Sequence, residues 1–303
     1  MTYLNRRDAA KAISAKTVRE IYLILTALII NLATVHIKPF YMFISSGKSS
    51  QELANDPFLL RMSWENIREN YRMVFTGERL SPTGGAMKIY TPFFLQLRNV
   101  LIQVASALVF LVVCAVPIGY VLGRRNFKGK RAYLLFLIFI QTVPLFGYLI
   151  AFYVLMDAMG FTNNLIGTGL IFAGVSMPGA IIFLRGFFVS FPGEIEEAAE
   201  VDGAGEWKKF LWIIIPMARG IIVSIVLINF MGYWNEFGIS SLLLTDPDLK
   251  TISINVMMTA DAQNNQTYLF PLLVLSSVPT LLIFTLFQRE ITTGGLTMGS
   301  LKG

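Results

Sequence analysis

The charged stretch PGEIEEAAEVDGAGEWKKFLWIIIP occupies residues 192–216 and separates two long apolar regions. It contains Glu194, Glu196, Glu197, Glu200, Asp202, Glu206, Lys208 and Lys209. A polar segment this short cannot bury a hydrophobic core of its own. We therefore interpret it as a docking element that the rest of the chain holds in place.

The surrounding composition is that of a lipid-embedded protein. The 303 residues are 54% hydrophobic and 15% charged, against about 45–50% and about 25% in globular proteins. Four runs lack any charged residue, and each exceeds the roughly 20 residues that cross a bilayer: 99–123, 132–156, 158–184 and 262–288. We predict an all-α membrane protein with a permease region at 21–290 and six spans, at about 18–44, 94–122, 132–156, 165–188, 217–237 and 268–287.

The first span follows a basic segment, 1–20, and is interrupted by His36, Lys38 and Pro39. A charged start before an apolar core also fits a cleaved signal peptide. No small-x-small cleavage site stands out, so we expect the segment to remain as a span. We place His36 near a membrane interface; a proton relay is the alternative.

The first long polar region, 45–93, is predicted to be a loop outside the cell. Its residues 63–75 have the pattern of a short amphipathic helix, with Ser63 as N-cap and Asn66 in the first turn. Ser81-Pro82-Thr83-Gly84-Gly85 is predicted to be a turn.

Lysine and arginine counts orient the chain. With the N-terminus inside, the inner segments hold 16 of these residues and the outer segments nine. Cytoplasmic loops carry the excess of positive charge in membrane proteins. Segments 1–20, 189–216 and 288–303 are therefore predicted to be cytoplasmic. This rule also accounts for the basic link 123–131 without nucleic acid, which we exclude as a partner.

The stretch at 192–216 has the pattern of a helix, a turn and a second short helix. Pro192 suits a first helical turn, and three glutamates near the N-terminus are favoured by the helix dipole. Ile195, Ala198 and Ala199 would form one small apolar face. Gly203 would end the helix because glycine accepts the left-handed conformation, and Glu206 would begin the second helix. An ordinary solvated loop is the alternative.

The order of residues in this stretch resembles the EAA loop of permease subunits of ABC importers. The matching positions are Glu197-Ala198-Ala199, Gly203, Ile213 and Ile215-Pro216. The family signature has leucine where this chain has Ile215, a change that keeps the apolar character. We treat the match together with its place in a six-span chain as the indication.

Three further segments resemble carbohydrate permeases related to the second subunit of the maltose permease. The tail Gly294-Gly295-Leu296-Thr297-Met298-Gly299-Ser300-Leu301-Lys302-Gly303 is similar to the tail of that group. Trp234-Asn235-Glu236-Phe237 is similar to the segment that closes its fifth helix, and 66–75 to a segment before its second.

The resemblance implies a type I ABC importer permease fold in a bacterial or archaeal cytoplasmic membrane. It implies a second homologous permease, two ATPase subunits, an extracytoplasmic solute-binding protein and a carbohydrate substrate. Alternating access would be driven by ATP through residues of the loop at 189–216: Glu194, Glu197, Ala198, Ala199, Asp202, Gly203 and Pro216. Tail residues Gly295, Leu296, Thr297, Gly299 and Lys302 would reach the ATPase, and loop 238–266 the binding protein.

The sequence offers no ATP site or catalytic site of its own. Gly47-Lys48-Ser49 and Gly129-Lys130 fail as phosphate loops, because Met42 replaces the first glycine of one and Arg131 follows the lysine of the other. One cysteine and one histidine argue against a metal site. We expect no cofactor in this chain, with ATP and Mg bound by the partner ATPases, and no enzymatic activity.

Two alternative functions stay open. One is a permease for a non-sugar solute, which the EAA loop alone would not exclude. The other is an ion-coupled secondary carrier, which should carry paired intramembrane acids. For a sugar path we select polar and aromatic residues within the spans, although such residues more often bond across helices: Gln141, Tyr148, Asn229, Tyr233, Trp234 and Asn235.

Overall fold

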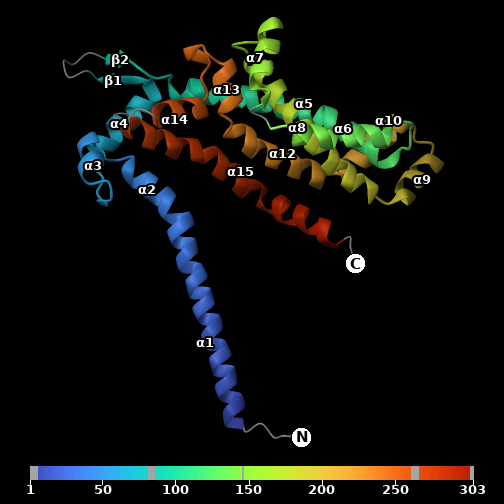
Figure 1. Cartoon of the computed structure of the whole chain (residues 1–303), viewed down its shortest axis with the longest axis horizontal. Helices are drawn as coiled ribbons and strands as arrows, with labels where there is room; N and C mark the ends of the chain where they lie inside the picture. The colour runs from blue at the N-terminus through green and yellow to red at the C-terminus, as the bar shows by residue number, and fades with distance from the viewer. Residues whose placement is uncertain (1–5, 81–85, 145–146, 261–265, 301–303) are drawn as a thin grey trace.

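The computed structural model describes residues 6–80, 86–144, 147–260 and 266–300 (Figure 1). Within these ranges the chain is helical apart from one antiparallel pair of short strands, β1 (Glu78–Leu80) and β2 (Ala86–Lys88), with Arg79 opposite Met87. The prediction of a mainly helical protein is confirmed. The predicted turn at 81–85 lies outside the described residues.

Two parallel helices form the centre of the molecule, α5 (Phe93–Arg124) and α8 (Leu165–Val189). Glycines let them approach closely. A Cβ built on Gly119 would lie 2.6 Å from Cβ of Leu184, and one on Gly123 would lie 2.6 Å from Cβ of Phe188. Small residues are the usual means of close helix packing in a bilayer, where lipid tails are as apolar as leucine.

Helices α12 (Arg219–Trp234) and α15 (Gln266–Ser300) pack beside this pair. The indole of Trp234 donates a hydrogen bond to the main-chain oxygen of Ser276, at 3.2 Å. Tyr268 is fully buried, stacks on Tyr90 with ring centroids 3.7 Å apart and hydrogen-bonds to Gln96. The core is therefore assembled from segments far apart in the sequence.

The span expected at 132–156 is not one continuous helix. It consists of α6 (Lys130–Thr142) and α7 (Leu149–Ala158). Val143, at the end of α6, is extended with φ −78° and ψ 120°. The residue before a proline is disfavoured in the helical region, and Pro144 itself cannot donate to the helix. The single span predicted at 132–156 contains Pro144, and the helix breaks at this proline.

The N-terminal helices extend away from the rest of the molecule (Figure 1). They are α1 (Arg6–Asn31), the π-helix Leu32–His36 and α2 (Ile37–Ser45). Pro39 lies just after the π-helical turn. Proline has no N–H to donate to the carbonyl four residues earlier, and the wider π-helical turn accommodates this missing hydrogen bond. From Ile21 to Phe43 the large apolar side chains are largely exposed, as expected for a helix that lipid or another subunit surrounds.

Four helices are long and apolar enough to cross a membrane: Arg19–Ser45, Phe93–Arg124, Leu165–Val189 and Gln266–Gln288. A fifth crossing results if Glu206–Met217 and Arg219–Trp234, bent by 69°, count as one span. Helix α7 is apolar but shorter. The fold is thus a helical membrane protein with four to five candidate spans among the described residues.

The region between the first two spans contains α3 (Ser50–Asn55) and α4 (Trp64–Thr76). The predicted amphipathic helix is present. Ser63 occupies its N-cap position, as predicted, although its side chain makes no capping hydrogen bond. Asn70 instead fixes α4 by donating to the main-chain oxygens of Ser46 and Lys48, at 3.0 and 2.9 Å.

The remaining helices lie in the two polar segments around α12. Residues 192–217 form α9 (Gly193–Val201), α10 (Glu206–Lys209), the π-helix Phe210–Ile214 and α11 (Ile215–Met217). After α12 come α13 (Gly238–Leu243), a 3₁₀ turn at Pro247–Leu249 and α14 (Ile252–Ala260). The predicted tail, 288–303, continues as the last turns of α15 as far as Ser300.

Candidate functional site: a charged hairpin and a polar membrane cavity

The hairpin formed by α9 and α10 lies at one end of the bundle (Figure 1). Gly203 has φ +76°, a conformation that favours glycine. Ala204 N–H donates to the oxygen of Ala199 at 2.9 Å, and Gly203 N–H donates to that of Glu200 at 3.0 Å. This bond pair is the Schellman motif, which satisfies the last carbonyls of a helix. The helix therefore ends where the sequence predicts, and for the predicted reason.

Arginine 124 anchors α9 to the end of α5. Its Nε donates to Oε1 of Glu196 at 2.8 Å, and its Nη1 donates to the main-chain oxygen of Phe191 at 3.1 Å. Glu196 is buried, and Ala199 on the same face is 5% exposed. Ile195 also packs against the core. This face of α9 points into the protein and cannot be the surface for a partner.

Lysine 209 and Arg125 anchor α10. The Lys209 side chain is fully buried and donates to Glu200 at 2.5 Å and to Glu206 at 3.1 Å. Arg125 pairs with the other oxygen of Glu206. The Arg125 guanidinium, followed by the Lys209 ammonium, holds the pKa of the Glu206 carboxyl below its usual value. The two arms of the hairpin are thus joined to each other and to the basic link after α5.

The opposite face of the hairpin is open to solvent. It carries Glu194, Glu197 and Ala198, and beside the turn it exposes two large apolar side chains, Val201 at 88% and Trp207 at 76%. Asp202, Gly203 and Pro216 are exposed as well. The prediction of one apolar face containing both alanines is wrong, because Ala199 is buried against the bundle whereas Ala198 is exposed. An apolar patch within an acidic rim is the usual form of a protein-binding surface.

Sequence reasoning missed both the anchors and the exposed apolar pair. The link 123–131 was used only to orient the chain, yet Arg124 and Arg125 hold the hairpin. A basic segment and an acidic segment on the same predicted side of the membrane were an available signal. Nothing in the sequence marks Val201 and Trp207 as exposed, because their orientation depends on which face of the hairpin is buried.

A second site lies within the helix bundle. A cavity of about 300 Å³ is lined by Gln141 of α6, by Ser176 and Gly179 of α8, and by Asn229 of α12. Asn229 donates to the oxygen of Ile225 at 2.8 Å, within its own helix. The structure therefore brings together two of the predicted path residues, Gln141 and Asn229, with amide groups able to hydrogen-bond a polar solute.

The other predicted path residues have packing partners. Tyr233 is buried and stacks on Phe172, with ring centroids 5.4 Å apart. Trp234 donates its hydrogen bond to Ser276 of α15 and stacks on Phe230. Tyr148 packs edge-to-face against Phe152. Asn235 is exposed at the end of α12 and bonds to Met231. Tyr233 lies near the cavity, because its hydroxyl is close to Ser176, which lines it.

Residues 234–237, which resemble the end of the fifth helix in carbohydrate permeases, have a local structural role. Glu236 accepts hydrogen bonds from the N–H groups of Ile239 and Ser240, at 2.7 and 3.0 Å. It thereby caps the N-terminus of α13, where a negative charge is favourable. The cap lies at the start of the segment 238–266, which the resemblance predicts to contact the solute-binding protein.

No group of three or more histidine, cysteine, aspartate or glutamate side chains is arranged to hold a metal ion in the part of the chain that the structure describes. Gly295, Leu296, Thr297 and Gly299 of the predicted ATPase-contacting tail lie in α15. Lys302 lies outside the described residues.

Residues 115–291 match the family model described as "Binding-protein-dependent transport system inner membrane component". The match begins within α5 and ends within α15. It therefore covers α8, the hairpin and the cavity in one continuous unit.

Curated relatives extend the likeness to most of the chain. A diacetylchitobiose uptake system permease protein, NgcG, from Streptomyces coelicolor is 30% identical over 91% of this chain and 87% of its own length. A maltose/maltodextrin transport system permease protein, MalG, from Photorhabdus laumondii is 30% identical over 79% of this chain and 83% of its own. A Bacillus subtilis maltodextrin transport system permease protein, MdxG, is also 30% identical, over 68% of this chain and 74% of its own.

The fold also has a solved counterpart. A chain of a bacterial ABC transporter involved in the import of the acidic polysaccharide alginate superposes with a TM-score of 0.70. The superposition covers 95% of this chain and 99% of that one, at 19% sequence identity. With the family match and the relatives at 30% identity, the chain belongs to the inner-membrane permease components of binding-protein-dependent transport systems, the ABC importers.

Proposed function

We propose that this protein is one permease subunit of an ABC importer for an oligosaccharide, and that the hairpin of α9 and α10 couples it to a cytosolic ATPase. The observation that carries the proposal is the two-faced hairpin. One face is fixed to the bundle by Arg124–Glu196 and Arg125–Glu206, while the other presents Val201 and Trp207. A lever needs both a rigid attachment and a free surface.

The attachment explains how movement would be transmitted. Arg124 is at the end of α5, and α5 packs along α8 through Gly119 and Gly123. A displacement of α9 therefore acts on the central helix pair without passing through a flexible loop. Closely packed helices move as rigid bodies. Closure of an ATPase dimer on ATP would shift the bundle between two openings, because ATP binds the closed state more tightly.

The proposed membrane arrangement has six crossings with both termini in the cytoplasm. Five of these crossings are the candidate spans described above. The remaining one, third in chain order, consists of α6 and α7 as one span that is broken at Pro144. Broken spans are tolerated where the freed main chain lines a cavity, and Gln141 beside this break lines the polar cavity. The Glu206–Met217 helix would lie at the cytoplasmic surface, with the 69° bend as the point of entry to the bilayer.

The proposed substrate class rests on the cavity and on the named relatives. Gln141, Ser176 and Asn229 present amide and hydroxyl groups with no charged side chain among the lining residues. Neutral hydrogen-bonding groups in an apolar wall suit a hydroxyl-rich, uncharged solute. The permeases from Streptomyces, Photorhabdus and Bacillus are named for diacetylchitobiose, maltose and maltodextrin. We propose a neutral oligosaccharide.

The proposed assembly contains this subunit, a second homologous permease, two ATPases that bind ATP and Mg, and an extracytoplasmic solute-binding protein. The exposed apolar surface of the N-terminal span, between Ile21 and Phe43, favours contact with another membrane subunit. The segment 238–266, which begins at the Glu236 cap, would meet the binding protein. The tail in the last turns of α15 would contact an ATPase.

Coupling is tested in the complete transporter reconstituted into vesicles. Gly203→Pro replaces a residue at φ +76° with one fixed near −65°, and Glu197→Lys reverses a charge on the free face. We expect each variant to assemble but to lose most binding-protein-stimulated ATP hydrolysis. Glu65→Lys, the same reversal at an exposed position on α4, is the control and should retain it. Normal stimulation in both hairpin variants would contradict the coupling role.

Substrate class is tested by titrating the cognate binding protein with a panel of oligosaccharides, amino acids and peptides. We expect binding to oligosaccharides alone. Asn229→Ala in the permease should then lower uptake of the bound sugar while leaving ATPase assembly intact. Binding of a non-sugar solute instead would replace the carbohydrate assignment with the alternative permease function, without affecting the coupling result.

A further inference from the structure

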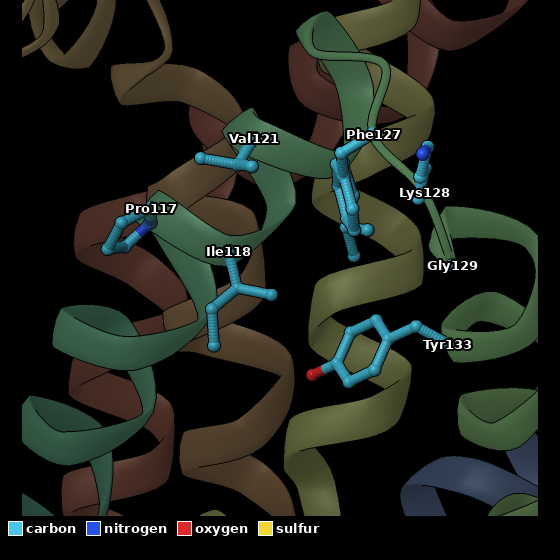
Figure 2. A pocket seen from close by; sticks show the side chains of 8 residues that line it. Pro117, Ile118, Val121, Phe127, Lys128, Gly129 and Tyr133 are labelled. Carbon is cyan, nitrogen blue, oxygen red and sulfur yellow. The ribbon is translucent and has the colours of Figure 1, made fainter.

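An apolar cavity near the link 123–131 is separate from the polar cavity and the hairpin surface. It has a volume of about 470 Å³ and is formed between the end of α5 and the start of α6. Figure 2 shows its lining, with Pro117, Ile118 and Val121 on one side and Tyr133 on the other. Its size is within the roughly 300–1,000 Å³ typical of ligand sites.

The walls of this cavity are apolar and open to the outside of the bundle. Val121 is 42% exposed and Phe127 47% exposed. The Tyr133 hydroxyl points into the opening, toward Ile118 (Figure 2). Pro117 lies within α5 and contributes its ring to the wall. An apolar trough with a hydroxyl at its edge, at the end of two spans, has the character of the membrane interface.

One lysine, Lys128, lines this cavity, and it belongs to the basic link 123–131. Of the five basic residues in the link 123–131, Arg124 and Arg125 pair with glutamates. Lys128 lines the cavity, and Lys130 donates only to neutral oxygens of Arg125 and Asn126, at 2.8 and 3.2 Å. In the described part of the chain, no ion pair neutralises Lys128, Lys130 or Arg131.

We propose that this cavity binds an anionic phospholipid of the cytoplasmic leaflet. An acyl chain would occupy the trough between Ile118, Val121 and Phe127, and the phosphate would lie against Lys128 and Arg131. The inference rests on the proposed orientation, which places the link 123–131 in the cytoplasm. Anionic headgroups attract basic residues that lie next to a span, and basic pockets between spans hold such lipids.

The combination of groups favours a phospholipid over a soluble anion or a protein. A soluble phosphate would need the cations but not the apolar trough, whereas a phospholipid needs both. Val109 and Val113, at spacings of four residues before Pro117 on α5, are exposed as well, so an apolar helix face leads from the cavity toward the region that hydrocarbon fills. The site would tie one lipid to the same link whose arginines hold the hairpin.

The test is native mass spectrometry of the assembled transporter taken from vesicles of equal phosphatidylglycerol and phosphatidylcholine. We expect retention of phosphatidylglycerol by the unaltered protein. Lys128→Gln with Arg131→Gln should lower the affinity for it roughly 25-fold, at about fivefold for each charge removed. Ile118→Trp should fill the trough and lower retention with all charges in place. Lys208→Gln, an exposed lysine of the hairpin, should leave retention unchanged.

Equal retention of phosphatidylglycerol by the charge-removal variant and by the Lys208→Gln control would overturn the site. Equal retention of phosphatidylcholine would overturn the preference for an anionic lipid. Undiminished retention of phosphatidylglycerol by Ile118→Trp would show that the acyl chain does not occupy the trough beside Ile118. Lipid retention is read without ATP, so its failure is distinguishable from failure of the coupling role, which is read from ATP hydrolysis in the Gly203→Pro and Glu197→Lys variants.

Discussion

At the hairpin end of the bundle, Arg124 and Arg125 pair with carboxylates of α9 and α10. At the other end, neutral amides perform the same task. Asn99 donates to the main-chain oxygens of Asp248 and Lys250, at 2.8 and 3.1 Å. Asn163 accepts from the N–H groups of Thr245 and Asp246, at 2.8 and 2.9 Å. Both ends join distant segments: the hairpin end through these two ion pairs, and the other end through these amide hydrogen bonds.

The difference matches what each end is proposed to do. Ion pairs have little directional demand compared with a network of main-chain hydrogen bonds, and exposed ones respond to salt and pH. Amide contacts to the main chain fix one geometry and do not titrate. The attachment of the hairpin should therefore weaken with salt and acid, whereas the attachment of the segment that contains α13 and α14 should not. Substitutions at the two ends should respond differently to salt and pH.

The largest effect is expected for Arg124→Ala. Its removal leaves Glu196, whose side chain is only 10% exposed, without a counter-charge. Breaking such a pair costs roughly 3 kcal/mol. Amide hydrogen exchange in α9 should quicken accordingly, while exchange in α13 stays unchanged. Arg124→Lys should recover part of the protection, because it keeps the charge but loses the bond to Phe191. Unchanged amide exchange of α9 in Arg124→Ala would show that Arg124 does not anchor this helix.

A smaller effect is expected for Asn99→Ala at the other end. Asn99 is fully buried, and its loss leaves the oxygens of Asp248 and Lys250 without this donor. An unsatisfied buried polar group costs about 1–3 kcal/mol. The midpoint of thermal unfolding in detergent should fall equally at low and high salt. Asn55→Ala, at an exposed asparagine of α3, is the control and should not shift it. A salt-dependent loss would contradict the contrast between the two ends.

The smallest effect concerns Glu206, whose side chain is 61% exposed. An exposed ion pair contributes well under about 1 kcal/mol. The pKa of Glu206 is lowered by Arg125 and then Lys209, so the contribution is present above its usual value of 4.5 and is lost as pH falls through the lower, folded value. Protection factors of α10 amides should be constant between about pH 8 and pH 5 and decline below 4.5.

Glu206→Gln provides the matching control for that pH dependence. It should abolish the decline of α10 protection below pH 4.5, and it should also reduce the salt sensitivity of α10. A decline that persists in Glu206→Gln would assign the acid sensitivity to another group of the hairpin.

Much of the fold was predictable because the signals are local. Long charge-free runs predict spans, and α5 and α8 correspond to two of them. Gly203 predicts a left-handed helix end, which the positive φ confirms. The π-helical turns before Pro39 and near Pro216 were not predicted, although both follow from the hydrogen bond that proline cannot make. The break at Pro144 was within reach of the same reasoning.

The site was less predictable because its contacts join distant segments. From the sequence alone, Gln141 and Asn229 were candidates for the substrate path on the same grounds as Tyr148, Trp234 and Asn235. Only the structure shows that Gln141 and Asn229 line a cavity. The Ser63 cap shows the same limit at short range. Its position was predicted, but the hydrogen bonds of the neighbouring Asn70 fix that helix instead.

The sequence by itself determined that this chain is a helical membrane protein of the ABC importer permease family with a polar hairpin between two apolar helices. Hydrophobic run length, charge bias and glycine at a helix end depend only on neighbouring residues. Tertiary structure decided which face of that hairpin is free, since burial of Ala199 and exposure of Ala198 depend on how α9 packs against α5. It also decided that Arg124 and Arg125 hold the hairpin while Lys128 lines a cavity, because residues about 70 positions apart meet only when the helices pack.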